Sequence, residues 1–260
     1  MPSAFFRSLI EVPATYQART TWGPWLAIGA SLAIFIGAAS LSLVLSELIA
    51  GASGGRSIFE TIRAGGAQED IKRYSMIWTA AMQVVLIVLT VGAASLFRAN
   101  PKDVLALRVP SQGWGVLVPA FAVLFLVTSL YSGAAYLLWP HGVFSDLKPF
   151  HEMMRSDSGF VLALAGVVGA PLSEELLFRG FLLAALSRSR LGFWGAVIVS
   201  NTAWTALHAQ YSLIGLGEVF LVGLVQSWLL WRTGSLWVPI ICHAIYNGLI
   251  LLALFMVPIT

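Results

Sequence analysis

The sequence has little charge and almost no cysteine. Only 10% of its 260 residues are Asp, Glu, Lys or Arg, while 58% are hydrophobic. A soluble domain carries about 25% charged residues, so this composition excludes an ordinary water-soluble protein and indicates a polytopic membrane protein. The single cysteine, Cys242, excludes an internal disulfide and says little about compartment.

Basic runs, internal repeats and a clear leader segment are also missing. The net charge of +3 is scattered through short connections, which favours contact with lipid headgroups and no nucleic-acid partner. Residues 1–21 mix Phe5 and Phe6 with Arg7 and Glu11, so we expect no cleaved signal peptide. They predict either a short interfacial helix or a disordered tail. Without a break in composition, residues 1–260 predict one integral membrane domain.

Apolar stretches are what the chain has in abundance. About 20 apolar residues are enough for a helix to cross a bilayer, and the ten Trp residues suit the interfacial belts of such a protein. The sequence therefore predicts an all-α fold, a polytopic transmembrane helical bundle of about seven to eight membrane helices. The predicted membrane segments are 25–50, 74–97, 114–139, 159–187, 192–209 (a short one), 213–231 and 236–257.

The distribution of Lys and Arg predicts the orientation of these segments. With the N-terminus inside, the inner connections carry eight Lys and Arg and the outer ones six. Because inner loops carry the excess of positive charge, we expect a cytoplasmic N-terminus.

Charged and polar side chains are rare inside the apolar segments, and most lie in the second half of the chain. A charge at the bilayer centre costs about 2.5–3.5 kcal/mol on insertion scales, so such residues are expected to be functional. The decapeptide 171–180 alone holds two carboxylates and an arginine. The polar residues of the last four segments are Glu174, Glu175, Arg179, Asn201, His208, Glu218, Gln226, His243 and Asn247.

Helical spacing separates the two adjacent carboxylates. Glu175 and Arg179 are four residues apart and share a helix face, which predicts an ion pair. Glu174 points about 100° away from Glu175 and stays free for chemistry. Pro171 predicts a kink that admits water. Ser173 predicts either a cap of the restarted helix or, as the weaker alternative, a serine nucleophile.

Two further segments present polar faces that can complete a hydrolytic site. Glu174 can act as general base on a water that His208 also holds, while His243 and Asn247, again four apart, can donate to an oxyanion. Alternatively, Glu174, His208 and His243 can bind a divalent metal that activates the water. No His-Glu-x-x-His helix is present, and the residues alone leave both alternatives open.

These residues form three short motifs that resemble the CPBP family, which comprises the type II CAAX prenyl proteases and their bacterial relatives, the Abi proteins. That family has Glu-Glu-x-x-x-Arg, Phe-x-x-x-His and His-x-x-x-Asn on separate membrane helices. The first and third motifs match at 174–179 and 243–247. The second matches at 204–208, except that Trp204 replaces Phe. The resemblance covers about residues 159–250.

The resemblance implies an intramembrane glutamate endopeptidase without a required cofactor, although a role for a divalent metal stays open. It implies that Glu174 is the base, that His208 positions the water, and that His243 and Asn247 stabilise the oxyanion. Glu175 and Arg179 then support the site. The expected partner is a peptide or protein substrate, prenylated or otherwise bound to the membrane, and the expected location is the bacterial inner membrane.

Two other functions remain open at this stage. Some members of the family are proposed to act in bacteriocin immunity or as regulators without proteolysis, which makes a non-proteolytic membrane regulator the main alternative. A transporter is the third interpretation, because intramembrane charges also mark ion paths. The chain shows no inverted repeat that would favour transport.

Overall fold

The computed structural model describes residues 9, 13–52, 57–63, 65, 68–156 and 159–256. Over these residues the chain is helical and has no β-strand, which confirms the predicted all-α fold. The elements are α2 (Pro24–Ala52), α3 (Ile58–Arg63), α4 (Gln68–Ala94), η1 (Leu96–Arg98), α5 (Pro101–Val104), η2 (Trp114–Val116), α6 (Leu117–Leu138), α7 (Pro140–Met154), α8 (Gly159–Leu164), η3 (Ala165–Gly169), α9 (Ala170–Glu174), η4 (Glu175–Leu182), α10 (Leu183–Leu186), α11 (Gly192–Ala206), α12 (Leu213–Thr233) and α13 (Trp237–Met256).

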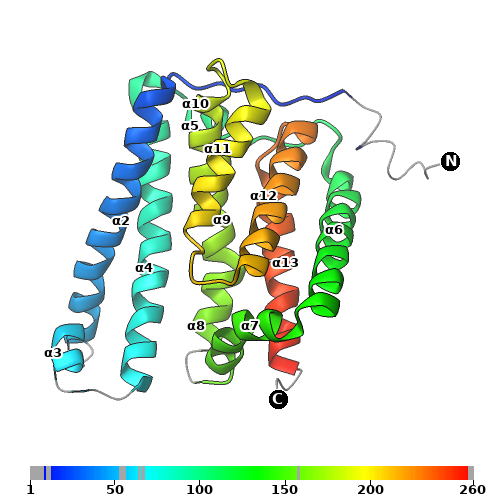
Figure 1. Cartoon of the computed structure of the whole chain (residues 1–260). Helices are drawn as coiled ribbons and strands as arrows, with labels where there is room; N and C mark the ends of the chain where they lie inside the picture. The colour runs from blue at the N-terminus through cyan, green and yellow to red at the C-terminus, as the bar shows by residue number, and fades with distance from the viewer. Residues whose placement is uncertain are drawn as a thin grey trace.

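The long helices form a bundle with the motif-bearing helices at its centre (Figure 1). Helices α2 and α4 pack as a pair on one side, and α4 also contacts the continuous segment from α8 to α10. On the other side, α12 packs against α6, α11 and α13. Helix α7 lies across one end of the bundle, where it contacts α12 and α13.

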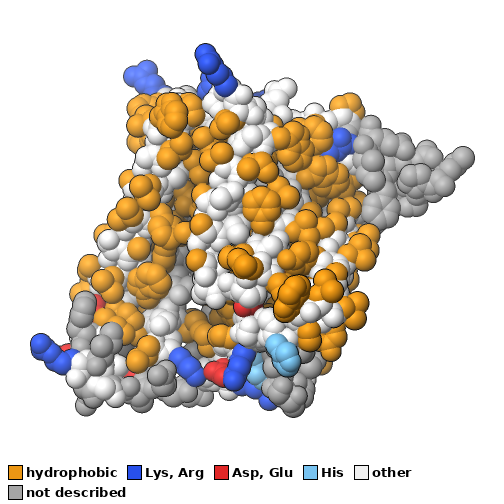
Figure 2. All heavy atoms as spheres, in the orientation of Figure 1, with side chains coloured by type: hydrophobic (Ala, Val, Ile, Leu, Met, Phe, Trp, Pro, Cys, Tyr) orange, Lys and Arg blue, Asp and Glu red, His pale blue; other side chains and the backbone are white. Residues whose placement is uncertain are grey.

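The outer helix α2 shows why this bundle belongs in a membrane. Its buried residues recur every three or four positions and are nearly all small: Ala27, Ser31, Ile34, Ala38, Ser42, Ser46 and Ala50. Large apolar side chains such as Trp25 and Leu48 point outward, 85% and 64% exposed. Small residues at helix contacts and large ones facing outward are typical of lipid-embedded helices. Figure 2 shows the same pattern, with apolar side chains along the bundle and Lys and Arg at its two ends.

Within the described part of the chain, six helical segments are long and apolar enough to cross a membrane. They correspond to six of the seven predicted segments, and they confirm a polytopic helical bundle. The predicted segment 192–209 is a helix, but α11 has only 15 residues, which gives a length of about 22 Å. This is shorter than the hydrocarbon core of about 30 Å.

Several connections predicted to be loops contain helices. Residues 140–158 hold α7, and residues 51–73 hold α3 and the first six residues of α4. Residues 13–23 form no helix; instead, the N–H groups of Thr15 and Tyr16 both donate to Trp231 O at 3.2 Å. This stretch therefore crosses the end of the bundle and is tied to the last turn of α12 (Figure 1). The remaining residues of the predicted interfacial segment 1–21, which are residues 1–8 and 10–12, lie outside the described residues.

Candidate active site

The helix that carries the first motif runs from α8 to α10 as one membrane-length segment, Gly159–Leu186. It does not restart at Ser173, whose hydroxyl donates to Ala170 O at 3.2 Å. The turns on both sides of Pro171 instead widen into the π-helical stretches η3 and η4. Proline cannot donate to the carbonyl four residues back, and its ring crowds that carbonyl. A local change of hydrogen-bond register accommodates it, and such π turns are frequent at functional sites.

Glu175 lies at the centre of a buried charged cluster. Its Oε1 lies 3.4 Å from Arg179 Nη1 and 3.1 Å from His243 Nδ1. All three residues are buried, with exposed fractions of 0% for Glu175, 1% for Arg179 and 5% for His243. The predicted ion pair is therefore confirmed, and it has a third member that helical spacing alone could not reveal.

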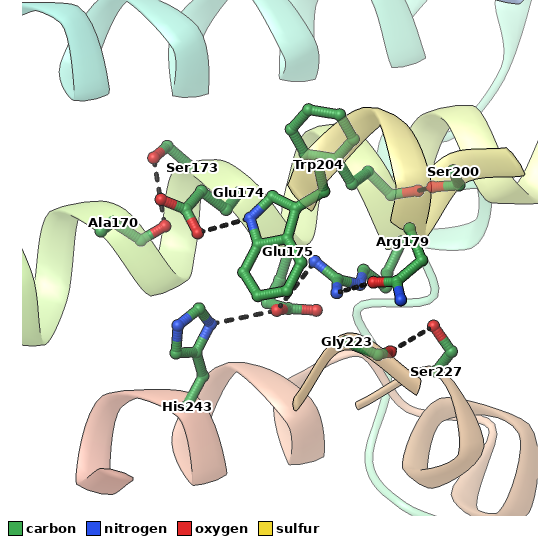
Figure 3. A network of polar contacts seen from close by, with 12 residues as sticks. Ala170, Ser173, Glu174, Glu175, Arg179, Ser200, Trp204, Gly223, Ser227 and His243 are labelled. Carbon is green, nitrogen blue, oxygen red and sulfur yellow. Dashed lines mark hydrogen bonds and ion pairs between the residues drawn. The ribbon is translucent and has the colours of Figure 1, made fainter. Parts of the chain in front are cut away.

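Glu174 turns away from this cluster and has a different partner. Its Oε2 accepts a hydrogen bond of 2.7 Å from the indole Nε1–H of Trp204 (Figure 3). The two adjacent carboxylates thus point to different neighbours, as predicted, and Glu174 is the one that remains outside the ion pair.

Trp204 brings the side chains of the three motifs together. The Arg179 guanidinium lies over its ring, 4.1 Å from the ring centroid. The rings of His208 and His243 meet it edge-on, at centroid distances of 5.2 and 5.9 Å. Five of the six site residues predicted from the sequence, all except Asn247, therefore lie in or directly around this cluster.

His208 lies two residues beyond the end of α11, in the connection to α12, which Figure 1 shows between the two ends of the bundle. Its Nδ1 lies 3.1 Å from Trp204 O. A backbone carbonyl only accepts, so this bond requires the hydrogen on Nδ1, and the neutral ring then keeps its lone pair on Nε2. His208 can therefore accept a hydrogen bond from a water molecule through Nε2.

Asn247 lies one helical turn beyond His243 on α13. Its Nδ2 donates to Gly166 O at 2.9 Å, which occupies one of the two amide hydrogens and leaves the other. His243 and Asn247 thus share a face of α13, while their described partners are Glu175 and Gly166. Their joint role as oxyanion donors stays a prediction.

Asn201 fixes the orientation of Arg179. Its Oδ1 accepts from Arg179 Nη2 at 3.2 Å, and its Nδ2 donates to Phe220 O at 2.8 Å. A Cβ added at Gly223 would collide with both Asn201 Oδ1 and Arg179 Nη2, so this close approach requires glycine. The sequence analysis included Asn201 among the intramembrane polar residues, but Asn201 belongs to none of the three motifs and no role was predicted for it.

Tyr211 is a neighbour of the site that the sequence analysis missed. Its ring centroid lies 5.7 Å from that of His208. Burial raises the pKa of Tyr211 to about 12, and the negative charges of Glu174, Asp146 and Glu218 contribute to the shift. The phenol therefore keeps its proton at neutral pH and stays a hydrogen-bond donor beside His208. Its position three residues after His208 in the sequence was the signal that could have identified Tyr211 as a neighbour of the site.

Glu174, His208 and His243, which the sequence analysis gave as possible metal ligands, are not arranged as a metal-binding site. Among the described residues, no three His, Cys, Asp or Glu side chains are grouped to hold a metal ion. His243 Nδ1 faces Glu175, and Glu174 Oε2 faces the Trp204 indole. We therefore derive no chemical step through a metal.

Residues 156–249, which include all three motifs, match the model of the family described as "Type II CAAX prenyl endopeptidase Rce1-like". The chain is 33% identical over 133 residues to "Uncharacterized 24.3 kDa protein" of Escherichia coli, a match that covers 49% of this chain and 58% of that protein. It is 22% identical over 202 residues to "Putative membrane peptidase YdiL" of Bacillus subtilis (strain 168), covering 75% and 79%. No solved structure matches significantly.

Proposed function

We propose that this chain is an intramembrane endopeptidase of the CPBP family, which holds the type II CAAX prenyl proteases and their bacterial relatives, and that it uses a water molecule activated by Glu174 and His208. The observation that supports this proposal best is the separation of the two carboxylates. Glu175 is shared by Arg179 and His243, whereas Glu174 has only the indole N–H of Trp204 as a described partner.

The first step is the removal of a proton from water. The Glu174 oxygen that is not bonded to Trp204 takes one hydrogen of the water, and His208 Nε2 accepts a hydrogen bond from the other. The water oxygen forms a bond to the carbonyl carbon of the scissile peptide, and the carbonyl oxygen becomes an oxyanion. Protonated Glu174 then gives the proton to the leaving amine as the C–N bond breaks.

The oxyanion needs donors that are already oriented. His243 has its Nδ1 against Glu175 Oε1, so in its imidazolium form the Nε2–H is directed away from that carboxylate and can donate. Asn247 has a second amide hydrogen besides the one bonded to Gly166 O. In this proposal Glu175 and Arg179 act on catalysis only by holding His243.

The proposed substrate is a peptide or protein that reaches the site from the lipid, prenylated or otherwise membrane-bound. The proposed location is the bacterial inner membrane, which agrees with the bacterial sources of the two relatives. The Lys and Arg excess in the inner connections supports a cytoplasmic N-terminus.

The experiment that tests this function is a comparison of new protein termini in membranes that contain the wild-type protein, the Glu174→Gln variant or neither. A protease produces termini that are present only with the wild type, and their sequences identify the substrate. If the wild type and the variant give the same termini and the same phenotype, the family's alternative role, a non-proteolytic regulator, replaces the proposal.

Metal chelation provides a second test of the mechanism. The proposed chemistry needs no metal, so we expect dialysis against EDTA to leave the cleavage rate unchanged, and we expect less than one divalent ion per purified chain by elemental analysis. Loss of activity with EDTA that stoichiometric Zn²⁺ restores would contradict the glutamate mechanism and support a metal-activated water.

A further inference from the structure

We propose that Trp204 is a positioning residue for the base: its indole N–H holds the Glu174 carboxylate in the orientation from which it takes the proton of water. This inference rests on the proposed function and deepens it. The family motif has Phe at this position, and phenylalanine has no hydrogen-bond donor. The substitution thus adds a polar contact to the site of this chain.

The contact between Trp204 and Glu174 has the geometry of a strong hydrogen bond. Its length of 2.7 Å lies at the short end of the range for bonds to an ionised carboxylate. Trp204 is only 2% exposed, and a buried indole N–H can donate but not accept, so it needs an acceptor. Glu174 supplies that acceptor through one of its two oxygens.

The indole ring itself has little freedom to turn. The Arg179 guanidinium lies over the ring at 4.1 Å, and the two histidine rings pack edge-on against it at 5.2 and 5.9 Å. The direction of the N–H is therefore set by packing on several sides. A donor held in this way can orient a carboxylate, whose own side-chain torsions are otherwise free.

The position of the ring also explains why Glu174 stays out of the neighbouring ion pair. One ring contacts Arg179 through its face and Glu174 through its N–H, so it separates the carboxylate from the guanidinium (Figure 3). With phenylalanine the ring can still cover Arg179, but nothing holds Glu174 in its place. The inferred role is therefore specific to the indole nitrogen and distinct from packing.

A spectroscopic measurement tests the contact without a substrate. In protein labelled with ¹⁵N-tryptophan and placed in lipid nanodiscs, the indole resonance of Trp204 is the one that Trp204→Phe removes. We expect Glu174→Gln to move its proton shift upfield, because a neutral amide oxygen accepts a weaker bond than a carboxylate. Glu218→Gln is the matched control, since Glu218 accepts from Ser132 and Tyr246, and it should leave the resonance in place. A resonance unmoved by Glu174→Gln overturns the inference.

The cleavage rate tests the role of this contact. With the substrate identified from the new termini, Trp204→Phe should lower kcat about tenfold and leave KM unchanged, because the charged hydrogen bond is lost while the aromatic packing remains. An unchanged or raised kcat overturns the positioning role. If Trp204→Phe does not fold, Trp204→His supplies the assignment of the resonance, and the response of that resonance to Glu174→Gln still decides the contact. If the wild type cleaves nothing, the proposed function fails, and the spectra decide the contact independently.

Discussion

Replacing Glu174 with Gln should lower the rate of peptide cleavage by about 10²–10⁴-fold, the range by which a general base accelerates such a reaction. Glutamine has nearly the same shape, and its amide oxygen can still accept from the Trp204 indole, but it cannot take a proton from water. The fold should therefore survive the change. The measurement is the initial rate on a peptide that spans the cleavage site, together with thermal unfolding of both proteins in the same detergent.

Glu218→Gln is again the matched control, because Glu218 is also an intramembrane carboxylate but accepts hydrogen bonds from Ser132 at 2.8 Å and Tyr246 at 2.6 Å. It should leave the cleavage rate within about twofold of the wild type. A Glu174→Gln protein that retains most of its activity, beside an inactive but folded Glu175→Gln protein, would exchange the roles that we assign to the two adjacent carboxylates.

Replacing Arg179 with Met should destabilise the fold by about 3–5 kcal/mol, the cost of breaking a buried ion pair by removing one partner. Arg179 and Glu175 are 1% and 0% exposed, with 3.4 Å between Nη1 and Oε1. Methionine fills much of the same space but leaves Glu175 buried with His243 as its described partner. The hydrogen bond to Asn201 and the stacking on Trp204 are lost at the same time. Reversible unfolding in mixed micelles measures the effect.

Two comparisons show whether burial causes this loss. Arg190→Met removes an exposed arginine from the connection between α10 and α11 and should change the free energy of unfolding by less than about 0.5 kcal/mol. Gly223→Ala leaves Arg179 in place but pushes its guanidinium and Asn201 aside, so it should destabilise the protein more than Gly29→Ala, where an added Cβ meets nothing within 4 Å. Equal stability of Arg179→Met and Arg190→Met would contradict the structural role of the ion pair.

The membrane fold and part of the site could be predicted from the sequence, because each follows from a short-range rule. Apolar length predicts a spanning helix whatever surrounds it, and six of the predicted segments meet that requirement. Glu175 and Arg179 pair within one helix, so their spacing of four residues is enough to predict the contact. The same rule predicted that Glu174 would point elsewhere.

Contacts between helices could not be predicted in the same way. Helical spacing gives the face on which His243 lies but not the helix that this face meets, so its contact with Glu175, 68 positions away, appears only in the folded bundle. The π turns depend on how the chain accommodates Pro171 within a packed core, where a kink and a change of register compete. Trp204 stands where the family motif has Phe. Only the structure shows that its indole nitrogen donates a hydrogen bond to Glu174.

The short length of α11 has a consequence for where a substrate would be cut. The helix ends at Ala206 after 15 residues, and the connection that follows lies between the two ends of the bundle (Figure 1). His208 therefore sits at a depth that the number of residues in α11 determines. Each additional helical turn would move it by about 5.4 Å. In the proposed mechanism α11 acts as a molecular ruler: it sets how far below the membrane surface the scissile bond must lie, and so selects substrates by the position of that bond.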